Sequence, residues 1–329
     1  MPMYRRALLK AALAAPALAV FASGAWAQSA RTVSYDDFDR YLAALTAIDG
    51  HGEPNAALQA YIEAAGPGLQ TWLGIYPFTA EQLAAQLERR PAYYRALAGL
   101  RPRLVALEPE ILAAYAQLEA LHAGADLGGV YFLVGRYSAG GTARHLGAMV
   151  AVEFFGRTAE TDMSEFSADD TLYGEGELVQ TVVHEGVHNL QRQIQGDANF
   201  ISIYVDPTRM TLLNFAVREG VADYVTNLVS NRLISSRHDA LDPIEADVWA
   251  EFQPLMQANI MEAPGWFQGD FADGRVWPNQ PGYYVGYKMA EHIHLNAPDR
   301  SAALIELLSP HTDEQFAAIA ARYAQKFAS

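Results

Sequence analysis

The chain has 329 residues, 51% of them hydrophobic, with 38 acidic side chains against 23 basic ones and no cysteine. Such a length can bury one large core or two lobes. The acidic balance makes nucleic acid and anionic membrane surfaces poor partners. Without cysteine there are no disulfides and no cysteine nucleophile, so any metal must be held by histidine and carboxylate side chains.

Residues 1–27 have the pattern of a cleavable export signal. Arg5, Arg6 and Lys10 precede an apolar run, and the small-residue site AWA at 25–27 follows it. The paired arginines fit a twin-arginine signal or an ordinary secretory one. Removing the segment leaves 20 Lys+Arg against 38 Asp+Glu, a net charge of −18. We therefore expect an exported protein, in a bacterial periplasm, with no membrane span after signal removal.

The next region, residues 28–125, predicts an N-terminal helical lobe. Its Ala- and Leu-rich segments at 79–87, 91–100 and 108–123 carry apolar residues at helical spacing and are separated by Gly and Pro. This lobe could form one wall of a cleft.

Two strands are predicted at the start of the central region, residues 126–235. The segments 130–134 (VYFLV) and 148–155 (AMVAVEFF) are rich in β-branched and aromatic residues. The segment 138–142 (SAGGT) lies between them and has the composition of a hairpin loop.

The most informative motif follows, HEGVH at 184–188, inside a helix predicted to end at Gly196. Positions i and i+4 share one helix face, so His184 and His188 can reach one metal ion. Glu185 would then lie beside the open coordination position. This HExxH spacing is typical of zinc hydrolases, in which the histidines bind Zn²⁺ and the glutamate takes a proton from the metal-bound water.

A second predicted helix, from 210 to about 233, contains Glu219 and Asp223 at the same i, i+4 spacing. Glu219 would be the third metal ligand, and Asp223 would accept the free ring N–H of a liganding histidine. A solvated helix face is the alternative for such a pair. Because the surrounding helix is apolar, the buried charges favour a metal as their neutralising partner.

Three blocks, TVVHEGVHNLQ, VREGVADYV and GYYVGYKMAE, resemble a family of bacterial predicted zinc-dependent proteases, which is similar to the thermolysin and aminopeptidase group of gluzincins. The match is scattered over roughly residues 125 to 295. The resemblance implies a helix-dominant α+β fold with a small sheet before the HExxH helix and helical flanking lobes. It also implies the same roles for Glu185, Glu219 and Asp223.

An edge strand in such enzymes pairs with the substrate backbone. Residues 140–142 could let a peptide approach closely, and a simple hairpin loop is the alternative for this segment.

The last block also suggests a group that stabilises the oxyanion. Tyr283 and Gly286 resemble the YxxG pattern of the aminopeptidase branch, although Val285 stands where lysine is usual. Tyr287, one turn further on, is the alternative, as is a packing role for these tyrosines. For His292 and His294 we expect structural or surface roles.

We therefore expect a zinc-dependent peptide hydrolase in which zinc-bound water attacks an amide carbonyl, with Glu185 as general base and then acid. Peptides or proteins would be its substrates. Two alternatives stay open: an exported zinc hydrolase acting on a non-peptide substrate, and a gluzincin-like metal-holding protein without proteolytic activity.

A loop at 196–209 is expected to join the two helices that carry the candidate ligands. A C-terminal helical region, 236–329, would follow, with a loop at 278–282 and a last helix at 312–327.

Overall fold

The computed structural model describes residues 31–167, 170–267, 269, 271, 277 and 280–328, which belong to one compact unit, Arg31–Ser329. The expected export signal at 1–27 lies outside the described residues. No described helix is long and apolar enough to cross a membrane.

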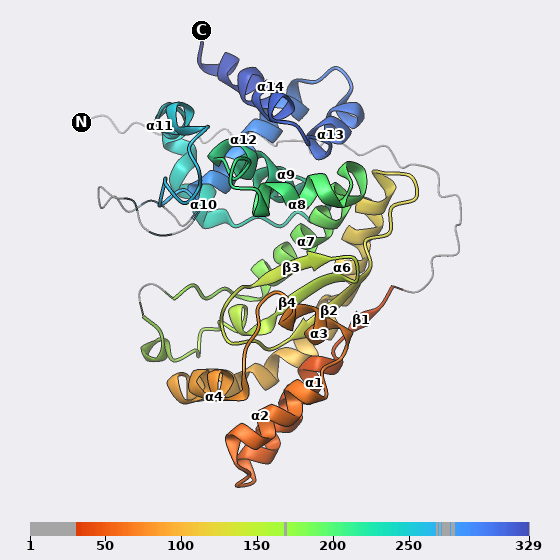
Figure 1. Ribbon diagram of the computed structural model, residues 1–329, viewed down its shortest axis with the longest axis vertical. Helices are drawn as coiled ribbons and strands as arrows, with labels where there is room; N and C mark the ends of the chain where they lie inside the picture. Colours follow the sequence, from red (N-terminus) through yellow and green to blue (C-terminus); the bar gives the residue numbers. More distant parts are fainter. Residues whose placement is uncertain are drawn as a thin grey trace, which may run out of the picture. The chain divides into compact units, whose positions relative to one another are not determined.

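The fold is α+β with helix dominant, as expected, and it contains a four-stranded mixed sheet (Figure 1). The strands lie in the order β1-β2-β4-β3, so β3 forms one edge. β1 and β2 run parallel, β2 and β4 run parallel, and β3 is antiparallel to β4. The bounds are β1 Val33–Ser34, β2 Gly129–Leu133, β3 Gly141–Arg144 and β4 Gly147–Ala151.

The strand predictions were right for 130–133 and 148–151, and wrong for the end of the second strand and for the connection. The segments 130–134 and 148–155 do not form a hairpin, because β2 and β4 are parallel neighbours, and part of the expected loop at 138–142 is the edge strand β3. All of β4 is buried, and a continuous apolar run is typical of a strand covered on both faces. β4 ends at Ala151, and Val152–Phe154 forms a short 3₁₀-helix instead of further strand.

The N-terminal helices lie where the sequence predicts helices, with different bounds. Thr79 caps one of them, since its side chain accepts the N–H of Gln82 in a capping box. The expected helix at 108–123 is longer and starts at Leu100, because Pro109 is accommodated inside it. The bounds are α1 Asp36–Asp49, α2 Pro54–Glu63, α3 Pro67–Leu73, α4 Ala80–Arg89, α5 Pro91–Ala96 and α6 Leu100–Ala120.

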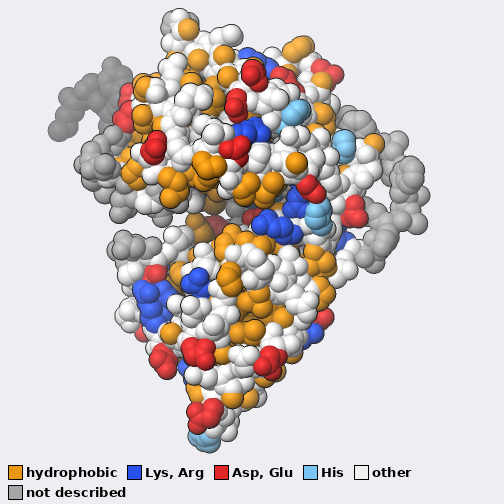
Figure 2. Space-filling view, in the orientation of Figure 1, with side chains coloured by type: hydrophobic (Ala, Val, Ile, Leu, Met, Phe, Trp, Pro, Cys, Tyr) orange, Lys and Arg blue, Asp and Glu red, His pale blue; other side chains and the backbone are white. Residues whose placement is uncertain are grey.

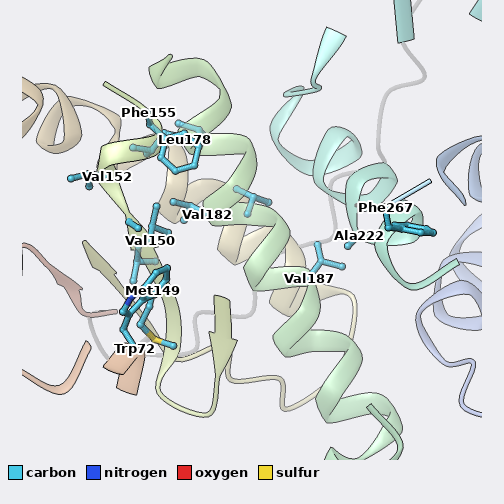
Figure 3. Close-up of a cluster of buried hydrophobic side chains, with 14 of the residues drawn as sticks. Trp72, Met149, Val150, Val152, Phe155, Leu178, Val182, Val187, Ala222 and Phe267 are labelled. Carbon is cyan, nitrogen blue, oxygen red and sulfur yellow. The ribbon is translucent and has the colours of Figure 1, made fainter. Parts of the chain in front are cut away.

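The two helices predicted to hold the metal ligands are α7 (Glu175–Gln195) and α9 (Leu212–Ser230). α7 ends at Gly196, whose φ of 80° is a conformation that favours glycine. In Figure 3 Val182 of α7 lies near Val150 of β4, and Leu178 of α7 lies beside Phe155. The sheet therefore supports α7 from one side, and α9 packs against its other side.

The expected loop at 196–209 is wrong, because most of it forms helix α8 (Asp197–Val205). Its Phe200 and Ile203 are buried. The segment lacks a clear sequence periodicity, and burial of these two side chains outweighs its weak local preference.

The C-terminal region is helical, and the expected last helix is present as α14. The expected loop at 278–282 is wrong at its end, because α12 begins at Pro281, which suits the first turn of a helix. Residues 278 and 279 lie outside the described residues. The bounds are α10 Ser235–Leu241, α11 Glu245–Phe252, α12 Pro281–Asn296, α13 Arg300–Leu308 and α14 Asp313–Ala324.

Helices α9 and α12 approach each other through two glycines. A Cβ added to Gly286 would lie 1.6 Å from the carbonyl oxygen of Ala216, and one added to Gly220 would lie 2.2 Å from the carbonyl carbon of Gly286. No side chain fits between the two backbones at this point. The contact brings Tyr283, one turn before Gly286, toward the helix that carries Glu219.

Candidate metal centre

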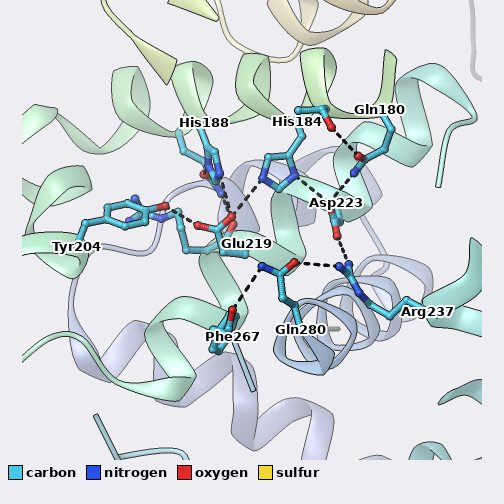
Figure 4. A network of polar contacts seen from close by, with 12 residues as sticks. Gln180, His184, His188, Tyr204, Glu219, Asp223, Arg237, Phe267 and Gln280 are labelled. Carbon is cyan, nitrogen blue, oxygen red and sulfur yellow. Dashed lines mark hydrogen bonds and ion pairs between the residues drawn. The ribbon is translucent and has the colours of Figure 1, made fainter. Parts of the chain in front are cut away.

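Two adjacent helices bring three possible ligand side chains together. His184 and His188 lie one turn apart on α7, and Glu219 faces them from α9 (Figure 4). The Oε2 atom of Glu219 is 3.2 Å from Nε2 of His184 and 3.1 Å from Nε2 of His188. All three residues are buried. This group could hold a metal ion.

Two of the three separations between the donor atoms match the spacing that a small ion requires, and all three lie within 4.8 Å. Ligand atoms bonded at about 2.0–2.1 Å in a tetrahedron lie roughly 3.3 Å from one another, close to the two separations from Glu219. Burial alone would raise the pKa of Glu219, but the imidazoles of His188 and His184 outweigh it and hold that pKa well below its ordinary value. The centre therefore offers one ionised carboxylate and two ring nitrogens.

Each histidine is held by a hydrogen bond at its other nitrogen. Nδ1 of His184 lies 2.8 Å from Oδ1 of Asp223, and Nδ1 of His188 lies 2.8 Å from Oε1 of Gln191. Both acceptors favour a proton on Nδ1, so Nε2 is the nitrogen that faces Glu219, and it carries the lone pair only when the imidazole is neutral. The same tautomer is the one that a metal ligand needs.

Asp223 is itself fixed from two further directions. Nε2 of Gln180 donates to its Oδ1 at 2.8 Å, and Nη1 of Arg237 donates to its Oδ2 at 3.1 Å. All of these groups are buried, and Figure 4 shows the contacts that join them. The carboxylate therefore has little freedom to turn away from His184, because two donors and the ring N–H constrain both of its oxygens.

Four of these polar neighbours are absent from the sequence predictions. Gln180 and Gln191 lie four residues before His184 and three after His188, a helical spacing that could have identified them. Tyr204 donates its hydroxyl to Oε1 of Glu219 at 2.7 Å, but it lies in the segment expected to be a loop. Arg237 belongs to α10 and carries no local sequence signal.

The centre opens into a cavity of about 350 Å³. Glu185 lines it beside the histidines, and burial raises the pKa of Glu185, partly opposed by the charges of His188, His184 and Arg144. A Cβ on Gly141 of β3 would lie 2.9 Å from Oε1 of Glu185. Glycine at this position therefore leaves space for the Glu185 side chain against the edge strand.

Tyr283 also lines the cavity, with its ring centroid 6.1 Å from that of His184. No hydrogen bond joins its hydroxyl to another described residue, in contrast to Tyr204. The guanidinium of Arg237 lies over the Tyr283 ring, 4.9 Å from its centroid, in a cation–π contact. Burial raises the pKa of Tyr283 well above its ordinary value, so the phenol remains a donor.

The remaining candidates lie elsewhere. Tyr287 accepts a hydrogen bond from Asn227 at 2.8 Å and does not line the cavity. Nδ1 of His294 lies 2.6 Å from the hydroxyl of Tyr224, and His292 packs near Tyr323. The structure thus brings His184, Glu185, His188, Glu219 and Tyr283 to one cavity, with Asp223 behind His184, and places Tyr287, His292 and His294 outside it.

A search for related proteins returned no match among protein-family models, curated proteins or solved structures.

Proposed function

We propose that this protein is a zinc-dependent peptide hydrolase of the gluzincin type. The observation that carries the proposal is the convergence of His184 and His188 Nε2 on Glu219 Oε2, with Glu185 lining the same cavity. Two nitrogens and one carboxylate are a ligand set that leaves a fourth position open, as catalytic zinc sites do. A buried carboxylate directly beside such a set suits proton transfer.

The chain's own residues have separate tasks in this proposal. A zinc ion held by His184, His188 and Glu219 would supply Lewis-acid activation of water and of the amide carbonyl. Glu185 takes a proton from the attacking water and returns it to the leaving amine, a role that its place beside the ligands in the same cavity favours. The Tyr283 hydroxyl donates a hydrogen bond to the carbonyl oxygen as negative charge develops there.

A peptide substrate is supported by the edge strand. β3 pairs with β4 on one side only, and no described strand lies on its other side. Gly141, Thr142 and Ala143 of β3 line the cavity beside Glu185. An extended peptide could therefore add to this edge through main-chain hydrogen bonds, with its scissile amide near the candidate metal ligands.

The test combines metal analysis with a peptide library. We expect the chain without residues 1–27 to bind about one zinc per molecule and to cleave members of the library. Glu185→Gln should retain zinc and lose activity by roughly a hundredfold or more. Glu177→Gln, on the same helix but outside the cavity, is the matched control and should remain active.

Each outcome decides a different part of the proposal. A folded protein that binds no zinc would contradict the assigned ligands. Zinc binding without cleavage of any peptide would favour a metal-holding protein or a hydrolase for another substrate. Full activity in Glu185→Gln would remove the assigned base.

A further inference from the structure

Two arginine side chains meet at one backbone oxygen on the wall of the cavity. Nη1 of Arg144 donates to the carbonyl oxygen of Ala143 at 2.8 Å, and Nη2 of Arg192 donates to the same oxygen at 3.0 Å. Arg144 ends β3, and Arg192 lies in the last turn of α7. The edge strand and the helix of the candidate metal centre thus hold two like charges close together.

The charges of this arginine pair are incompletely neutralised. Asp197 lies 3.5 Å from Nε of Arg192, and its other oxygen lies 2.9 Å from Nε2 of His145, so the carboxylate is shared. No carboxylate of the described residues forms an ion pair with Arg144. Burial, reinforced by repulsion from Arg144 and opposed by the charges of Asp197 and Glu185, lowers the pKa of Arg192. Two guanidinium groups at one site are unfavourable unless an anion joins them.

Arg144 is accessible from the reaction site. It is half-buried and lines the same cavity as Glu185 and Glu219. Basic side chains and a histidine gather beside the hollow in Figure 2. Arg192, by contrast, is buried and adds its positive charge at the same carbonyl oxygen of Ala143. The anionic group of a ligand would therefore contact Arg144 while the rest of that ligand occupied the cavity.

We propose that Arg144, supported by Arg192, is a carboxylate-binding subsite, so that the preferred substrates are peptides with a carboxylate near the scissile bond. This inference rests on the proposed function. The carboxylate belongs either to an aspartate or glutamate side chain or to the C-terminus of the peptide. Guanidinium binds both groups through paired N–H donors, whereas a neutral amide receives no such charge assistance.

The experiment compares peptides that differ only in this charge. Glutamate is exchanged for glutamine at each position around the cleaved bond, and every peptide is made with a free and an amidated C-terminus. We expect kcat/KM to be roughly tenfold or more higher for the acid than for its amide partner. Arg144→Gln should bring this ratio close to one, and Arg144→Lys should retain part of it. Arg95→Gln, an exposed arginine paired with Asp49, is the matched control and should keep the full ratio.

The outcomes separate the subsite from the reaction. A preference at one peptide position assigns a side-chain carboxylate, and a preference only for free C-termini assigns the terminal one. Equal rates for acids and amides, or a preference that survives Arg144→Gln, would overturn the subsite and leave hydrolysis intact. If no peptide is cleaved, binding of a fluorescent acidic peptide to zinc-loaded Glu185→Gln is compared with and without Arg144→Gln. Weaker binding supports the subsite without the reaction, and equal binding overturns it.

Discussion

We expect the free energy of unfolding to decrease as the pH rises from acidic to neutral, because Glu153 loses its proton. Replacing Glu153 by glutamine should abolish this decrease. Glu153 follows β4 and is fully buried. Its Oε1 accepts the backbone N–H groups of Gly135 at 3.0 Å and Tyr137 at 3.2 Å, while Oε2 has no hydrogen-bond partner among the described residues. Burial, only partly opposed by these N–H groups, raises the pKa of the carboxyl to about 7.

The sign follows from comparing the folded and unfolded chains. Between about 4.5, the ordinary value, and about 7, the folded protein keeps a proton that the unfolded chain has released. The contribution of protonated Glu153 is therefore fully present below pH 4.5 and is lost as the pH rises to about 7. The difference between the two pKa values corresponds to roughly 3 kcal/mol in the free energy of unfolding.

The measurement is urea unfolding of both proteins at several pH values from 4.5 to 8. The amide oxygen of glutamine can accept the same two N–H groups, so Glu153→Gln should fold but lack the charge. From pH 4.5 to 8 the wild-type protein should lose about 3 kcal/mol of unfolding free energy relative to Glu153→Gln, so the variant gains in relative stability at high pH. Glu160→Gln, at an exposed position, should show no such shift. A gap between wild type and Glu153→Gln that stays constant with pH would refute the reasoning.

Three further substitutions test the geometry around the centre. Asp223→Asn should weaken zinc binding about 10- to 100-fold in a chelator competition, because it alters the acceptor for His184; unchanged affinity would contradict the orienting role. Tyr283→Phe should lower kcat by about a hundredfold with a smaller effect on KM, and an unaltered kcat would exclude it from the reaction. Gly286→Ala should lower Tm, because the added Cβ would overlap the Ala216 carbonyl at a cost of about 1–3 kcal/mol. A wild-type Tm would show that the two helices can move apart to accept the methyl group.

The candidate ligands could be predicted because their information is local. His184 and His188 share a helix face by spacing alone, and so do Glu219 and Asp223. The apolar stripes of both helices and the glycine after α7 are also readable from neighbouring residues. The spacing along each helix does not show that the two helices pack against each other. That packing was inferred from the side chains, because one metal ion could be shared only if the helices lay side by side.

The rest depends on distant contacts. α8 has little helical signal of its own and forms because Phe200 packs against the ring of His188 and the guanidinium of Arg218. Tyr204 reaches Glu219 only as a result. The parallel pairing of β2 with β4 likewise cannot be read from their apolar sequences, because burial on both faces removes the alternation that would reveal their neighbours.

The contact between Gly220 and Gly286 fixes the separation of α9 and α12 without any rotatable side chain. A gap filled by leucine or methionine can adjust through rotamer changes, but a backbone surface has no rotamers to change. The spacing between the carboxylate of Glu219 and the phenol of Tyr283 is therefore set mainly by the two main chains. Sequence drift in the surrounding core should alter the stability of this pair of helices more readily than the distance between those two groups.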